Sequence, residues 1–170
     1  MPRTLHAWYS LSELEALGQR EAQLSGEIDA TRLTRLRELL HSDDGSVRAN
    51  FRFGQQGAGY VTVELDYEIC LELACQRCLE PIEEKASRHV SLVVLEDESM
   101  VAGAPAGYEP ITLSGERFQP AEVIEDELIV SLPLIPRHAR IAECGGLAQS
   151  LEALMDENET RPTDRPLGSH

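Results

Sequence analysis

The chain has 170 residues, an ordinary apolar content of 42% and a formal net charge of −15 at pH 7. This length is typical of one domain, which we place at residues 1–148, followed by an acidic, polar tail at 149–170 that we expect to be disordered. The acidic charge disfavours broad, sequence-independent binding to nucleic acid, because that affinity comes from many cations that neutralise phosphates. An acidic chain suits basic partners better.

The basic residues are all arginines except Lys85. The guanidinium group can bind phosphate in a bidentate way, so individual arginines could still make local contacts with RNA. The sequence has no run of about 18 apolar residues, and its first residues, MPRTLHAWYS, lack the apolar region of a signal peptide. We therefore expect no membrane contact and a cytoplasmic location.

A first short helix is predicted to follow Ser10. Ser10 and Glu13 have the spacing of a capping box, and Leu14 follows as the first apolar position. Gly18 is placed to end the helix. An irregular or briefly extended piece should come next.

A second helix is predicted to begin after Asp29 and to end at Leu40. Leu33, Leu36 and Leu40 would form its apolar face. We interpret the arginines of this segment as a solvated rim, with contact to RNA or a partner as the alternative; they are Arg32, Arg35 (which should point away from the apolar face) and Arg37.

An antiparallel meander is predicted for the middle of the chain. After a turn cluster at 41–46, residues 47–54, 60–74 and 82–95 alternate between apolar and polar side chains. In the central strand every odd position is apolar or cysteine; these are Val61, Val63, Leu65, Tyr67, Ile69, Leu71, Leu73 and Cys75. One face of this strand should therefore be buried.

The C-terminal half should begin with a mobile acidic loop at 96–108 and a brief strand at 111–113. Pro120 suits the first turn of a helix that buries Ile124 and Leu128. Its acidic residues have no motif spacing of a hydrolytic carboxylate pair, so we interpret them as a solvated face that matches the helix dipole and propose no catalytic acids. The prolines of 132–136 should hold the chain extended after the helix.

These elements indicate an α+β fold, a predominantly antiparallel sheet with two or three helices. The central strand is longer than most, so it should bend or coil, and we expect the sheet to curl in a barrel-like manner.

A Cys-x-x-Cys motif, Cys75-Gln76-Arg77-Cys78, ends the central strand at a strand-to-strand turn. Such a pair can supply two zinc ligands, and a tetrahedral site needs two more. The candidates are Cys144, His138, His89 and Cys70, of which Cys70 is disfavoured because it lies on the opposite strand face from Cys75. Two reduced cysteines in a turn explain the motif equally well. A thioredoxin-like redox site is less favoured, because that motif opens a helix.

Four segments of the sequence resemble the large ribosomal RNA subunit accumulation protein family, known as YceD. They are LACQRCLEP at 73–81, YEPI at 108–111, IEDELI at 124–129 and LPLIP at 132–136. The resemblance covers roughly residues 20–147. It implies a bacterial or plastid protein needed for accumulation of large-subunit rRNA, whose gene often neighbours that of a small basic ribosomal protein.

The resemblance also implies a ligand set. Many members of that family carry further cysteines after the Leu-Pro segment, and His138 stands where such members place one of them. Cys144 lies in a piece, ECGGL, that resembles another. Because histidine can replace cysteine at zinc, we predict that Cys75, Cys78, His138 and Cys144 hold a structural zinc ion.

The resulting hypothesis is a non-enzymatic ribosome biogenesis factor needed for 23S rRNA accumulation. It would act through a basic large-subunit ribosomal protein or a pre-ribosomal particle, with local arginine contacts to rRNA. The alternative is a zinc-stabilised adaptor that binds a protein outside the ribosome. A nuclease is disfavoured, because no glycine-rich phosphate loop or catalytic motif is present.

Overall fold

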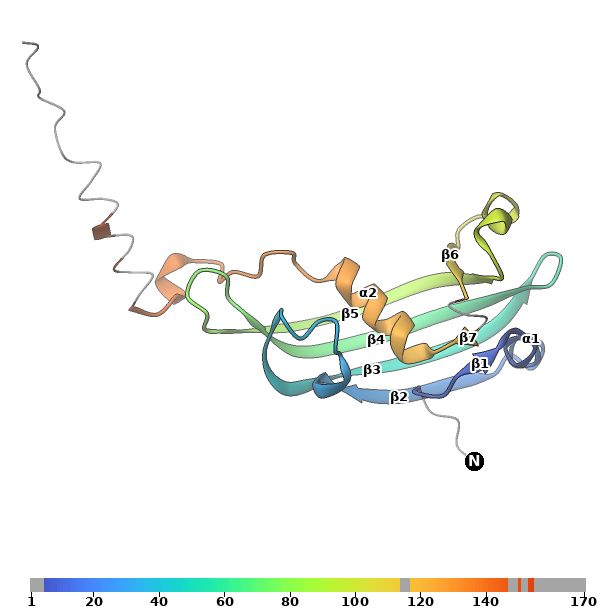
Figure 1. Ribbon diagram of the computed structural model, residues 1–170, viewed down its shortest axis with the longest axis horizontal. Coiled ribbons are helices and arrows are strands. Elements are labelled where there is room, and N and C mark those ends of the chain that lie inside the picture. The colour runs from blue at the N-terminus through green and yellow to red at the C-terminus, as the bar shows by residue number, and fades with distance from the viewer. Residues whose placement is uncertain (1–4, 114–116, 147–149, 151–152, 155–170) are drawn as a thin grey trace, which may run out of the picture.

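The computed structural model describes residues 5–113, 117–146, 150, 153 and 154. A long five-stranded sheet forms the body of the molecule, in the order β2-β3-β4-β5-β6, and the helices α1 and α2 lie against it (Figure 1). This is the predicted α+β class.

The strands of the main sheet are antiparallel neighbours except for β6, which runs parallel to β5. Their bounds are Gln23–Asp29 for β2, Leu40–Gln56 for β3, Tyr60–Ala74 for β4, Pro81–Leu95 for β5 and Glu109–Thr112 for β6. The predicted meander of three strands is confirmed as β3, β4 and β5. The brief strand predicted at 111–113 is confirmed as β6, shifted by two residues at its start.

Strand β4 buries one face, as the alternation predicted. Its odd positions from Val61 to Leu73 are at most 5% exposed, and Cys75 just beyond the strand is fully buried. The even positions face the opposite side of the sheet and are mostly polar. Burying each large apolar side chain contributes about 2 kcal/mol to stability. This strand is therefore the centre of the core.

Helix α1, Leu11–Gln19, begins as predicted. The Glu13 backbone N–H donates to the Ser10 hydroxyl at 3.4 Å, and the Ser10 N–H donates to the Glu13 carboxylate at 2.9 Å. The role predicted for Gly18 is wrong, because Gly18 lies inside the helix. It allows close contact with β3, since a Cβ atom there would lie 2.7 Å from the Gly54 carbonyl oxygen.

Helix α2, Pro120–Ser131, lies across the inner face of the sheet (Figure 1). Ile124 and Leu128 are fully buried, as predicted. The Tyr67 hydroxyl of β4 donates to the Ser131 hydroxyl at 3.3 Å, which joins the end of the helix to the central strand. Leu132 then takes an extended conformation, in agreement with the proline-rich sequence that follows.

The second predicted helix is wrong. Residues 23–29 form β2, a 3-10 helix occupies Ala30–Arg32, and turns lead to Leu40, where β3 begins. Leu33 and Leu36 are nevertheless buried. Successive turns, in which the Leu36 N–H donates to the Leu33 carbonyl, place these two side chains on one side of the chain, as a helix would.

The arginine rim and the acidic face were also only partly correct. Arg35 is not a freely solvated side chain: its guanidinium binds Glu125 at 3.1 Å and Asp126 at 2.5 Å, both on α2. Glu125 is only 6% exposed, so it belongs to the core rather than to a solvated face.

The predicted turn cluster at 41–46 lies within β3 as an irregularity. The pairing with β4 shifts between Leu40 and Gly45, so that four residues of β3 oppose a single residue of β4. Gly45 has a φ of 114°, a conformation that suits glycine.

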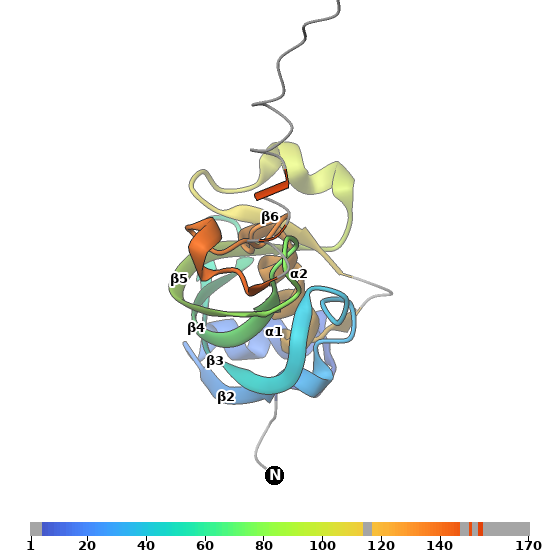
Figure 2. The same ribbon diagram turned by 90° about the vertical axis from the view of Figure 1, so that its left-hand side faces the viewer.

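The sheet is not closed, which corrects the barrel-like expectation. Figure 2 shows β5, β4, β3 and β2 following one another around α2, with the two edge strands apart. Strand β6 pairs only with Leu92–Leu95 at the end of β5, whereas β2 pairs with 46–52 in the middle of β3. The two edges therefore do not meet, and the helices cover the inner face instead.

A separate two-stranded pair, β1 at Tyr9–Ser10 and β7 at Arg117–Phe118, lies next to α1 and leads into α2. The predicted loop at 96–108 includes a 3-10 helix at Glu98–Gly103. Most of the predicted tail, 149–170, lies outside the described residues, so its disorder stays a prediction. No helix in the described part of the chain is long and apolar enough to cross a membrane.

Candidate metal centre

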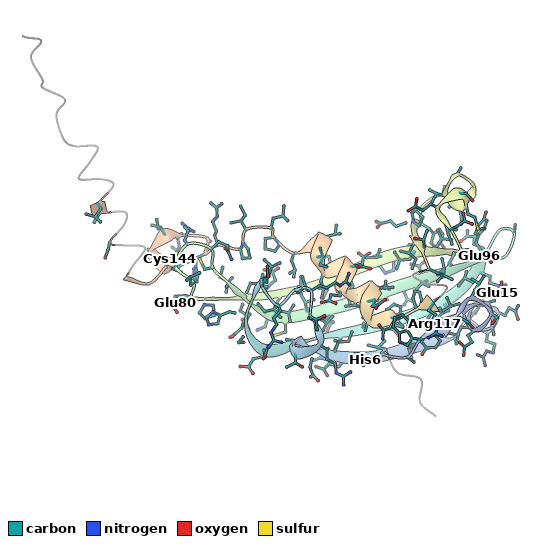
Figure 3. The ribbon with its side chains drawn as sticks, viewed as in Figure 1. His6, Glu15, Glu80, Glu96, Arg117 and Cys144 are labelled. Carbon is teal, nitrogen blue, oxygen red and sulfur yellow. The ribbon has the colours of Figure 1, made fainter. Side chains whose placement is uncertain are left out.

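All four predicted ligands meet at one end of the molecule. One donor atom from each of Cys75, Cys78, His138 and Cys144 lies within 4.8 Å of the others. Figure 3 places Cys144 beside Glu80 at this end, far from Glu15 and Glu96 at the other. In Figure 2 the turn after β4 and the segment after α2 cross in the foreground.

The first cysteine pair is positioned by the turn between β4 and β5. The Cys75 N–H donates to the Glu80 carbonyl at 3.0 Å, and the Leu79 N–H donates to the Cys75 carbonyl at 2.8 Å. Leu79 has a φ of 64°, which is unusual for a branched residue. This tight loop points both thiols toward the same space.

The second pair comes from the segment after α2, which crosses the turn. The Gln76 N–H donates to the Pro136 carbonyl at 2.9 Å, and the Arg77 guanidinium donates to the His138 carbonyl. A short 3-10 helix, Ile141–Glu143, then presents Cys144, whose N–H donates to the Ile141 carbonyl at 2.9 Å. Backbone contacts therefore hold the histidine and the third cysteine over the first pair.

The two distances from the His138 ring to the neighbouring thiols fit a tetrahedral metal site. His138 Nδ1 lies 3.6 Å from Cys78 Sγ and 3.7 Å from Cys144 Sγ. A zinc ion with bond lengths of about 2.3 Å to sulfur and about 2.0 Å to nitrogen places such ligand atoms roughly 3.5–3.8 Å apart. The donor set of three thiolates and one imidazole is also one that zinc prefers.

The surroundings of the cluster shift the pKa values of two of its thiols in opposite directions. Burial acts to raise the pKa of the Cys75 thiol, but hydrogen bonds from the backbone N–H groups of His138, Arg77 and Cys78 outweigh it and lower that pKa to about 5. Burial and the neighbouring Cys78 and Cys75 raise the pKa of Cys144 to about 11. A dication between the sulfur atoms would compensate the negative charges of thiolate ligands held this close together.

The cluster is packed apart from the main core. Cys75 and Cys144 are the buried residues of a second, small apolar group, to which the partly buried Cys78, Ile82 and Ile141 are added. So few apolar contacts stabilise this end weakly. A metal that joins the turn to the segment after α2 would compensate for this small core.

The other two candidate ligands lie elsewhere. His89 and Cys70 are on the outer face of the sheet, where the His89 ring contacts Asp66 at 2.7 Å and Glu64 at 3.0 Å. Cys70 is exposed and pairs in register with Lys85. The strand-parity argument against Cys70 is confirmed, and the same argument would have removed His89.

The geometry is that of a closed site. Four protein donors leave no open position for a substrate, which is typical of structural rather than catalytic zinc. The strand β5 follows the motif, so the helix that a thioredoxin-like motif opens is missing here. Arg77, which helps to position His138, was not identified from the sequence, although it lies between the two cysteines of the motif. The Nε atom of Arg77 is buried and has no hydrogen-bond partner within the described chain.

Comparison with known proteins finds a matching family and a similar curated protein. The family model for the large ribosomal RNA subunit accumulation protein YceD matches residues 63–167, a range that contains all four clustered residues. A protein of Haemophilus influenzae named large ribosomal RNA subunit accumulation protein YceD is 28% identical over 123 residues, which are 71% of this chain and 70% of that protein. No solved structure matches the chain.

Proposed function

The chain belongs to the family of large ribosomal RNA subunit accumulation proteins, YceD, and we propose that it is a non-enzymatic assembly factor needed for accumulation of 23S rRNA. The observation that carries this proposal is the family match over residues 63–167. The protein would act in the cytoplasm, by binding a basic ribosomal protein or a pre-ribosomal particle of the large subunit.

The charge of the chain supports a protein-mediated mode of action. A net charge of −15 repels naked rRNA but attracts basic ribosomal proteins over distances of about 10 Å at moderate salt. Arginines that face solvent, such as Arg137, could add local contacts to rRNA once the protein is bound.

Deletion of the gene tests the proposal. We expect the deletion strain to contain less 23S rRNA than 16S rRNA on quantification of total RNA, and fewer large subunits on sucrose gradients, with recovery when the gene is restored. A tagged protein should sediment with large-subunit precursors. Copurification with a non-ribosomal protein alone would favour the adaptor outside the ribosome, and cleavage of precursor rRNA by the pure protein would make it an enzyme.

We further propose that the Cys75, Cys78, His138 and Cys144 cluster binds one structural zinc ion. The ion would supply no chemistry beyond cross-linking the turn after β4 to the segment after α2. Elemental analysis of purified protein should find about one zinc per chain, and Cys75→Ser should reduce it to a small fraction. Cys70→Ser is the matched control, because Cys70 is an exposed cysteine of β4, the strand that leads to Cys75. An intact protein without zinc would refute the metal site.

A further inference from the structure

Four large aliphatic side chains at the end of α2 and just after it face solvent. Val130 is 85% exposed and Leu134 is 88% exposed, with Ile129 at 40% and Ile135 at 54%. We name these four residues the apolar surface. Side chains exposed singly are ordinary, but four within seven residues, two of them almost fully exposed, indicate a contact surface.

The exposure follows from the way α2 is packed. Ile124 and Leu128 turn toward the sheet, so Val130 lies on the opposite side of the helix. The chain then extends from Leu132 toward the metal centre, where the Gln76 N–H fixes Pro136. The apolar surface is therefore held between two anchored points.

Acidic side chains continue the same side of the helix. Glu122 and Asp126 precede Val130 at intervals of four residues, so these two acids form an acidic stripe that leads to Val130. Glu127 lies one turn before Val130; burial raises its pKa, and the nearby negative charges of Glu109 and Asp126 raise it further. Of these acids only Asp126 has an ion pair in the described chain, with Arg35.

The outer face of the sheet differs from α2 in how its charged side chains are paired. Its charges are paired with one another: Arg52 binds Asp66 at 3.0 Å, and His89 binds both Asp66 and Glu64. That face presents no large exposed aliphatic side chain among the described residues. A partner with cations and apolar anchors is therefore better matched by α2 than by the sheet.

We propose that the apolar surface, with the acidic stripe beside it, is the docking site for a basic polypeptide segment that inserts apolar side chains between Val130 and Leu134 and directs its cations toward Glu122 and Glu127. This inference rests on the proposed function, because it names the surface through which a basic ribosomal protein would be bound. The apolar anchors supply affinity, and the charges supply orientation and speed of encounter.

Site-specific photo-crosslinking tests the surface directly. Full-length protein with benzoylphenylalanine at position 130 or 134 is produced in cells, irradiated, and isolated with the large-subunit precursor fractions. We expect both positions to crosslink to a basic ribosomal protein, and position 87 on the outer sheet face, occupied by the exposed Ser87, to give none. Crosslinks to RNA, to a second copy of the chain, or from position 87 alone would overturn the proposal.

A double variant gives a quantitative test. Val130→Asp with Leu134→Asp should lower the amount of protein bound to precursor particles at least tenfold, while the melting temperature stays within about 2 °C, because side chains this exposed contribute little to folding. Val101→Asp is the control, an exposed apolar residue on a different element. If the double variant binds particles like the wild type, the docking surface is wrong and the proposed function stands. If the wild type itself does not sediment with precursors, the proposed function fails and the inference with it.

Discussion

Glu125 is the residue that joins the N-terminal half of the chain to α2. Its carboxylate accepts hydrogen bonds from the backbone N–H groups of Arg35 at 2.6 Å and Leu36 at 3.3 Å, as well as from the Arg35 guanidinium. Asp126 and the Glu122 carbonyl bind the rest of that guanidinium. One buried carboxylate thus satisfies the donors of a turn about ninety residues away in sequence.

Replacing Glu125 should therefore cost much more than replacing its neighbour. We expect Glu125→Ala to lower the free energy of unfolding by about 3 kcal/mol, because it leaves buried N–H donors and a guanidinium without their acceptor. Asp126→Ala removes an ion pair whose carboxylate side chain is 63% exposed, so we expect less than about 1 kcal/mol. Urea unfolding of the two variants compares them, and equal losses would contradict the assigned role.

The same residues show what sequence could not reveal at this scale. Arg35 and Glu125 both looked like solvated charges, because nothing in the local pattern of either segment points to the other. Cys75 and Cys78 were recognisable because their spacing is itself the signal. His138 and Cys144 were two of four candidate ligands, and only the family resemblance singled them out; the fold places them beside the first pair.

At the scale of elements, Gly18 decides how closely α1 approaches β3. Helix propensity alone predicts that Gly18→Ala would stabilise the protein by up to about 1 kcal/mol. The added Cβ would lie 2.7 Å from the Gly54 carbonyl oxygen, a backbone atom, so we expect a net loss of about 1–3 kcal/mol instead. Thermal unfolding measures the sign, with Glu15→Ala on the exposed side of the same helix as a nearly neutral control.

The charge of Glu127 on α2 should reduce stability. Burial first, and then Glu109 and Asp126, raise the pKa of Glu127 above its ordinary value, so folding favours its protonated form and opposes its charge. We expect Glu127→Gln to raise the melting temperature by roughly 1–3 °C at pH 7. The gain should vanish as the pH falls below about 4, where the carboxyl is protonated in folded and unfolded chains alike. A gain that grows in acid would contradict this sign.

Elements with a strong local period were predictable, and those fixed by distant contacts were not. The alternation of β4 and the proline-initiated α2 contain their own signals. The segment at 29–40 carries leucines at helical spacing, but hydrogen bonds to Glu125 hold it in turns. The residues just before it form β2, which pairs with β3. The alternation of Leu24 and Ile28 was a usable signal for β2. The parallel pairing of β6 has no local signature.

For the whole molecule, the open sheet leaves two regions of unequal stability. The main core extends between the helices and β3, β4 and β5, whereas the candidate metal centre has its own small apolar group. The barrel-like prediction assumed that a long strand must curl until the edges meet. Here α1 and α2 cover the inner face, so closure is unnecessary.

Removal of the proposed zinc ion should therefore loosen one end of the protein without unfolding the sheet. We expect a zinc chelator to abolish the hydrogen-exchange protection of residues 75–80 and 136–144, because their few apolar contacts cannot replace the cross-link. Protection in the middle of β4, around Leu65, should persist, since that strand is buried between α2 and its neighbours. The melting temperature should fall at the same time, and added zinc should restore it. Chelation that unfolds β4 as well would mean that the metal holds the whole fold, and chelation without effect on either region would mean that these four residues hold no metal.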